Sequence, residues 1–125
     1  METVYTKNAP EPVGPYSQAV KSGDLLFCSG QIPINPATNA VEKSDITGQS
    51  EQVIANIQAV LAEAGLVFEN VVKTTCFLQY IDDFAAFNEI YARYFTSKPA
   101  RSCVEAARLP KNVLVEIEVV AEYPK

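Results

Sequence analysis

An arginine and two glutamates near the C-terminus are the residues best suited to chemistry. Arg101 lies in the stretch PARSCVEAARLP, and its mostly apolar neighbours are typical of a buried strand. A guanidinium keeps its charge at physiological pH, so a buried one needs an anionic partner. That partner is either a glutamate of the protein, forming a structural salt bridge, or a small carboxylate ligand. The guanidinium fork would hold such a ligand through two parallel hydrogen bonds.

Glu116 and Glu118 supply the acid–base side of this hypothesis. In the segment VLVEIEVVA they share one face of an expected strand, and apolar residues share the other. Most charged residues on strands are simply solvated, and these two fit that reading as well. A glutamate in an apolar wall would instead have a raised pKa and could exchange protons near neutrality. An arginine that binds the substrate's charge and a glutamate that transfers its proton would together be enough to hydrolyse a small acid.

The absence of histidine narrows the chemistry further. It excludes Ser-His-Asp and Cys-His catalysis and most zinc sites, and it leaves Glu, Asp, Lys, Tyr or water for any proton transfer. The cysteines Cys28, Cys76 and Cys103 form no CxxC pair and indicate core-filling side chains in a reducing compartment. The net charge of -5 argues against nucleic-acid binding, which depends on clustered Lys and Arg.

Length and composition predict a single globular domain over residues 1–125. The chain is 48% hydrophobic and 20% charged, as in ordinary soluble proteins. Its apolar runs are too short to span a bilayer, so no membrane association is expected. Met1-Glu-Thr-Val-Tyr lacks the basic and apolar regions of a secretory leader, and a cytoplasmic location follows as the expectation.

Two helices are expected to position these residues. One begins near Thr47, with Asp45, Thr47 or Ser50 as N-cap, and ends before Gly65. The second opens at Ile81-Asp-Asp-Phe and carries an apolar stripe of Phe84, Phe87, Tyr91 and Tyr94. Asn88 borders this stripe, where it is either a packing residue or a ligand contact.

Runs of β-branched and aromatic residues predict strands at Asp24–Ser29, Val71–Tyr80, Arg101–Ala107 and Leu114–Glu122, with edge strands near Val4 and Gln18–Val20. The turn at Pro110-Lys-Asn predicts that the last two strands form a hairpin, so that Arg101 and a carboxylate share a pocket. This order of elements favours an α+β fold, with two helices packed on one face of a mixed β-sheet. The uncovered face then implies a partner subunit.

Several motifs together resemble the RidA (YjgF-type) family of imine deaminases over nearly the whole chain. They are Asn8-Ala-Pro, Gly14-Pro-Tyr-Ser-Gln-Ala-Val, Ser29-Gly-Gln-Ile-Pro-Ile-Asn-Pro, Asn56, Val72-Lys-Thr-Thr, Asp83-Phe with Asn88 and Tyr91, Pro99-Ala-Arg-Ser-Cys-Val-Glu with Ala-Arg-Leu-Pro-Lys, and Val115-Glu-Ile-Glu. The resemblance implies a chorismate-mutase-like fold and a homotrimer with ligand clefts between subunits. It also implies hydrolysis of 2-iminobutanoate and 2-iminopropanoate to 2-keto acids and ammonia, which protects pyridoxal-phosphate enzymes from these reactive imines and their enamine tautomers.

The resemblance also implies a role for each site residue. Arg101 would bind the substrate carboxylate, and Glu116 would polarise the attacking water and handle protons at the imine nitrogen. The backbone carbonyl of Cys103 would also hold that water. Tyr16, Ser29, Gly30 and Asn88 would line the cleft. A protonated imine is already a good electrophile, so the implied reaction requires no metal and no organic cofactor.

One departure from the family pattern concerns the loop before Arg101. Only Thr96-Ser-Lys separates Phe95 from Pro99, where many members have several more residues and an aromatic. The short loop and Lys98 leave the substrate preference open. Two other functions also stay open: a regulatory trimer that binds a small carboxylate without turnover, and a translation inhibitor acting as a ribonuclease.

Overall fold

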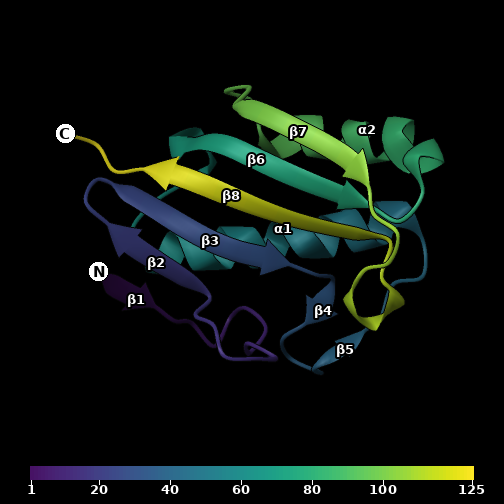
Figure 1. Ribbon diagram of the computed structural model, residues 1–125, viewed down its shortest axis with the longest axis horizontal. Helices are drawn as coiled ribbons and strands as arrows, with labels where there is room; N and C mark the ends of the chain where they lie inside the picture. The colour runs from purple at the N-terminus through teal and green to yellow at the C-terminus, as the bar shows by residue number, and fades with distance from the viewer.

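The computed structural model describes all residues from Met1 to Lys125. A six-stranded sheet carries two helices on one face, and a separate two-stranded sheet lies at one end (Figure 1). The elements, in chain order, are β1 (Glu2–Val4), β2 (Ala19–Ser22), β3 (Leu25–Gln31), β4 (Ile34–Asn35), β5 (Ala40–Val41), α1 (Ile46–Glu63), β6 (Val71–Leu78), α2 (Phe84–Tyr94), β7 (Ala100–Glu105) and β8 (Val115–Glu122). The predicted α+β class is confirmed.

Both helices form where the sequence predicts them. Asp45 is the N-cap of α1, and its carboxylate accepts a hydrogen bond from the Gly48 N–H at 3.1 Å. Gly65 follows the C-cap with φ of 78°, a conformation that glycine adopts without steric cost. A 3-10 turn at Ile81–Asp83 precedes α2, which itself begins at Phe84. Of the predicted stripe, Phe87 and Tyr91 are buried, while Phe84 remains exposed.

The strand order is β1-β2-β3-β8-β6-β7, and it contradicts the predicted hairpin. β7 pairs with β6 in parallel, with Arg101 opposite Thr74, and β8 pairs with β3 and β6. Parallel neighbours need a crossover, and α2 supplies it between β6 and β7. The Pro110 segment does turn the chain, with Lys111 and Asn112 at positive φ. It leads past β6 rather than into a neighbouring strand, because β6 occupies the place between β7 and β8.

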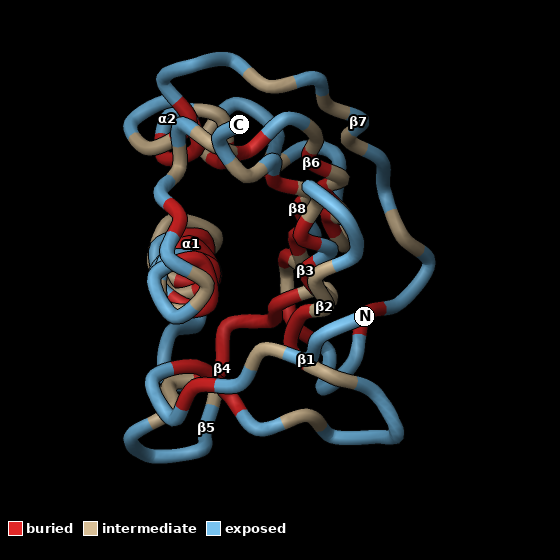
Figure 2. Tube along the Cα trace, turned by 90° about the vertical axis from the view of Figure 1, so that its left-hand side faces the viewer, coloured by how far each residue is buried: buried red, intermediate tan, exposed pale blue.

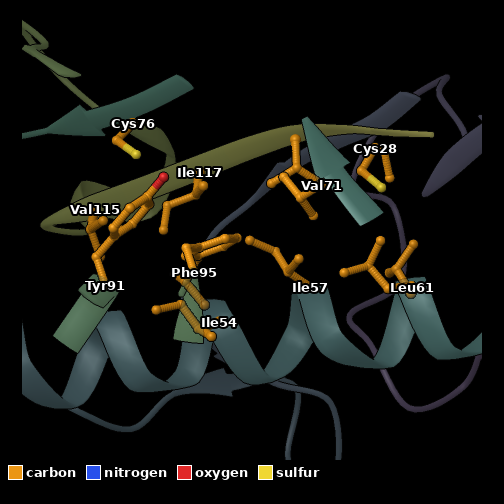
Figure 3. Close-up of a cluster of buried hydrophobic side chains, with 14 of the residues drawn as sticks. Cys28, Ile54, Ile57, Leu61, Val71, Cys76, Tyr91, Phe95, Val115 and Ile117 are labelled. Atoms are coloured by element: carbon orange, nitrogen blue, oxygen red, sulfur yellow. The ribbon is translucent and has the colours of Figure 1, made fainter. Parts of the chain in front are cut away.

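The main core lies between the sheet and the helices (Figure 3). β8 contributes one complete apolar face, on which Val115, Ile117, Val119 and Ala121 are buried. Glu116 and Glu118 project from the opposite face, as the alternation predicts. Tyr91 of α2 and Phe95, the residue after its last turn, stack in this core with ring centroids 4.4 Å apart.

The other face of the sheet carries no helix (Figure 2). Phe27 on β3 and Val104 on β7 project there and are nearly half exposed, at 46% and 47%. β7 is an edge strand whose residues are exposed or half-buried, so the expectation of a buried strand around Arg101 is wrong for the single chain. The prediction of one uncovered, partly apolar face agrees with this arrangement.

β4 and β5 form a small hairpin that the sequence does not predict. Asn56 of α1 supports it, because its side-chain amide donates to the carbonyls of Ile32 and Ile34 at 3.1 and 2.9 Å. Two-residue strands are too short to show a period in the sequence. Neither helix of the fold has the length and apolarity needed to cross a membrane.

Candidate functional site

Arg101 is held by neutral groups and by no carboxylate. Its Nη1 donates to the Oδ1 of Asn88 at 2.7 Å. Its Cζ lies 5.4 Å from the ring centroid of Phe84 and 4.8 Å from that of Tyr91. Two aromatic rings within 6 Å stabilise a guanidinium through their π faces. The structural salt bridge considered for Arg101 is therefore absent, and its charge is left without an anionic partner.

Tyr91 is fixed in turn by the buried residue Thr74. The two hydroxyl oxygens are 2.7 Å apart, and Thr74 lies on β6 directly beside Arg101 on β7. Burial is the main cause that raises the pKa of the Tyr91 hydroxyl, so the phenol stays neutral at physiological pH. The helical period predicts that Phe84, Asn88 and Tyr91 lie on one side of a helix, but it does not show that Arg101 meets all three. Thr74 lies in the Val72-Lys-Thr-Thr motif, but the motif does not show that its hydroxyl meets Tyr91.

Glu116 lies in a different hollow, on the open face of the sheet. Tyr16, Ser29 and Gly30 line this hollow with Glu116, so four of the predicted site residues gather here. Gly30 and Glu116 approach closely, because a Cβ at Gly30 would lie 2.9 Å from the carboxyl Cδ of Glu116. Only a residue without a side chain permits this approach.

The Glu116 carboxyl group is half-buried, and its electrostatics follow from that. Burial, and then the negative charge of Glu118 on the same strand face, raise the pKa of Glu116 above its ordinary value. Both effects disfavour the charged form. A carboxyl group whose pKa moves toward neutrality is better matched to taking up and returning protons at physiological pH.

The N-terminal segment that carries Tyr16 is held in place by the buried residue Gln18. The Gln18 side chain accepts from the Thr6 N–H at 2.7 Å and donates to the carbonyls of Thr6 and Pro10 at 3.0 and 2.9 Å. Ser29 ties the same segment to β3, because its hydroxyl donates to the Ser17 carbonyl at 2.6 Å. These bonds place Tyr16 over the end of β3 without any regular secondary structure.

The seven predicted site residues thus fall into two groups on opposite faces of the sheet. Tyr16, Ser29, Gly30 and Glu116 lie on the open face, and Arg101, Asn88 and Cys103 lie on the helix side at the β7 edge. The expectation that Arg101 and a carboxylate of the same chain share one pocket is wrong. It depended on the hairpin that the sheet does not contain.

The Cys103 side chain is half-buried at the edge of the core. It packs against the main core, and its neighbour across the parallel pair is Cys76. Burial raises the pKa of the Cys103 thiol, although the nearby Arg101 charge opposes the shift. No group of three or more His, Cys, Asp and Glu side chains in the structure is arranged to hold a metal ion.

Comparisons with known proteins agree with this fold and with the motifs. A family described as Endoribonuclease L-PSP matches residues 6–123. A RutC family protein of Pyrococcus horikoshii is 54% identical over 121 residues, which cover 96% of each chain. The solved structure of YyfA from Yersinia pestis, of the conserved Rid protein family, is 50% identical over 97% of this chain and 98% of that one, with a TM-score of 0.94.

The structure of E. coli TdcF with bound serine superposes with a TM-score of 0.95. The identity is 38%, over 99% of this chain and all of that one. Likeness of this extent in both sequence and structure shows common family membership, and the resemblance read from the motifs is confirmed. The chain belongs to the Rid family, the family also described as Endoribonuclease L-PSP.

Proposed function

We propose that the protein hydrolyses small 2-imino acids, such as 2-iminobutanoate and 2-iminopropanoate, to 2-keto acids and ammonia. The observation that carries this proposal is the environment of Glu116. Its carboxyl group is half-buried, its pKa is raised, and it borders a hollow that also presents Tyr16 and Ser29. An acid–base group of this kind is what hydrolysis of an electrophilic imine requires.

The working site combines the two residue groups from neighbouring copies of the chain in a homotrimer. Arg101 and Glu116 face opposite sides of one sheet, so a single chain cannot offer both to one small ligand. Stacking the β7 edge of one copy against the open face of the next would bring them together. The exposed Phe27 and Val104 on that face support such an association.

In this site Arg101 binds the substrate carboxylate and orients the imine carbon toward a water molecule. Glu116 accepts a proton from the water as its oxygen forms a bond to the carbon of the protonated imine. The product is a carbinolamine, and Glu116 then returns the proton to its nitrogen. Cleavage of the C–N bond releases ammonia as the oxygen becomes the keto group and gives up its remaining proton. Orientation and one acid–base group suffice, because the iminium ion is already a strong electrophile.

Ligand binding without turnover is the alternative that one comparison favours. TdcF was solved with serine, a small molecule that bears a carboxylate, and Arg101 suits such a ligand in either function. Glu116 favours catalysis over the binding of a keto acid, because a keto acid has no cationic group that a carboxylate could bind. A ribonuclease fits less well, since the chain is acidic and has no histidine.

The deciding experiment adds the protein to a threonine dehydratase reaction and follows the release of ammonia and 2-oxobutanoate. We expect release to become faster than the spontaneous hydrolysis of the imine. The Arg101→Ala variant should not accelerate it. If wild type and variant give the same rate as buffer while the wild-type protein still binds 2-oxobutanoate, the protein is a binding module.

A further inference from the structure

An open depression extends from Arg101 along the end of α2. Its walls include Tyr91, Phe95, Thr96, Lys98, Pro99 and Arg101. The short loop between α2 and β7 forms one side of it. The depression therefore adjoins the Arg101 guanidinium, on which the proposed function depends.

Two cations and no acidic residue line this depression. Arg101 has only the neutral Asn88 amide as its hydrogen-bond partner, and the exposed Lys98 is bonded to no carboxylate. This concentration of positive charge occurs in a chain with a net charge of -5. A concave site lined by charges of one sign attracts ligands of the opposite sign.

The backbone at Lys98 is in a conformation that seldom holds a lysine. Its φ is 57°, in the left-handed region that favours glycine and asparagine, and its N–H donates to the Phe95 carbonyl at 3.2 Å. Glycine would adopt this backbone conformation without the steric strain that a lysine Cβ causes. Non-glycine residues in such conformations cluster at active sites and ligand clamps, where the surrounding structure holds them.

We propose that Lys98 binds a second carboxylate, so that the preferred ligands are 2-imino and 2-keto dicarboxylates. Arg101 holds the carboxylate next to the imine carbon, and Lys98 meets the carboxylate at the far end of the side chain. This inference rests on the proposed function, because it extends the same site. It places the imines of acidic amino acids among the substrates.

The test compares the binding of two five-carbon keto acids, 2-oxoglutarate and 2-oxopentanoate, by isothermal titration calorimetry. They have the same carbon chain length and differ chiefly in the second carboxylate. We expect the wild-type protein to bind 2-oxoglutarate about three- to fivefold more tightly, which is the size of an exposed ion pair. The preference should decline as salt is added, because salt screens exposed charges.

Two variants remove the cation in different ways. Lys98→Gln keeps a polar side chain that is one atom shorter, and Lys98→Gly suits the positive φ, so at least one should fold normally. Both should lose the preference for 2-oxoglutarate and bind 2-oxopentanoate within about twofold of wild type. Arg93→Gln is the matched control: Arg93 lies in the last turn of α2 but outside the depression, and the preference should survive its loss.

The inference is overturned if the wild-type protein binds both keto acids equally or binds neither. It is also overturned if the preference persists in both Lys98 variants. Failure of the proposed function looks different, because binding needs no turnover. A dicarboxylate preference without any imine hydrolysis would leave the ligand class standing and refute the deaminase.

Discussion

The carboxyl group of Glu116 occupies the space that a side chain on Gly30 would need. A Cβ built on Gly30 would lie 3.1 Å from the Cγ of Glu116 and 2.9 Å from its Cδ. The backbone of Gly30 is not in the left-handed region, so alanine is compatible with its conformation. The lack of a side chain matters here because of Glu116 rather than because of the backbone.

Gly30→Ala should therefore displace the Glu116 carboxyl group while leaving the fold intact. Because a flexible glutamate can swing aside, we expect a loss of unfolding free energy of under about 1 kcal/mol. The hydrolysis rate should fall by about two orders of magnitude as the acid–base group leaves its place. In a Glu116→Gln background the same substitution should cost little further rate, since residues in contact act non-additively. Additive losses would mean that Gly30 acts independently of Glu116.

Glu116→Gln should reduce the hydrolysis rate by roughly two to four orders of magnitude, because the amide cannot accept and return a proton. The variant should keep its affinity for 2-oxobutanoate, since Arg101 remains. A rate equal to that of the wild type would remove Glu116 from the mechanism. Loss of binding together with rate would show that Glu116 organises the Arg101 side of the site.

The stability of the Glu116→Gln variant should depend on pH differently from that of the wild type. The pKa of Glu116 is raised in the folded protein, so its contribution to stability is fully present below the unfolded pKa and is lost as pH rises through the folded pKa. Glutamine does not titrate and lacks this loss. Glu116→Gln should thus be more heat-stable than wild type at pH 7, and the difference should shrink near pH 4. Thermal melts at both pH values check the sign.

Tyr91→Phe removes the hydroxyl that meets Thr74 but keeps the ring beside Arg101. Because the Thr74 hydroxyl is buried, we expect a loss of about 1–2 kcal/mol in unfolding free energy. The affinity for 2-oxobutanoate should stay within about twofold, since the ring face is retained. Tyr94→Phe is the control, because Tyr94 packs its ring against Phe68 and makes no side-chain hydrogen bond. Urea unfolding of both variants gives the comparison.

Cys103→Ser should keep most of the hydrolytic activity. The thiol has a raised pKa, and the chain has no histidine to activate it, so the sulfur is a weak nucleophile at neutral pH. Ammonia release by the purified variant measures this. A complete loss of activity in a variant with normal thermal stability would point to chemistry at the sulfur.

How far the sequence predicts this structure depends on the range of the interactions involved. The face of β8 that carries Glu116 and the apolar faces of the helices are readable, because periods of 2 and 3.6 are local properties. The position of β7 in the sheet cannot be predicted in this way, because the residue pattern of a strand does not show which strand it pairs with. The turn at Pro110 favoured a hairpin, and only the complete sheet shows that β6 lies between the two strands.

In the candidate site, too, the residue types can be predicted from the sequence, but their arrangement in space cannot. The motifs indicated Arg101 and Glu116 as residue types suited to the chemistry. Their separation onto opposite faces depends on the register in which β6 pairs with β7 and β8, and residue patterns within one strand do not reveal this register. The contacts of the Phe84 and Tyr91 rings with Arg101 also depend on the β6–α2–β7 crossover, which brings the helix over the edge strand.

The central claim, that one site takes Arg101 and Glu116 from different copies, is tested most directly by complementation. Arg101→Ala and Glu116→Gln chains with different tags are co-expressed, and assemblies that contain both are purified through the two tags. In a cyclic trimer, about one site in three then combines an intact arginine with an intact glutamate. Partnering Arg101→Ala with the Arg101→Ala/Glu116→Gln double variant is the control, because it restores no site. We predict about one third of the wild-type hydrolysis rate for the mixed assembly. A mixed assembly as inactive as either variant alone would contradict the shared site.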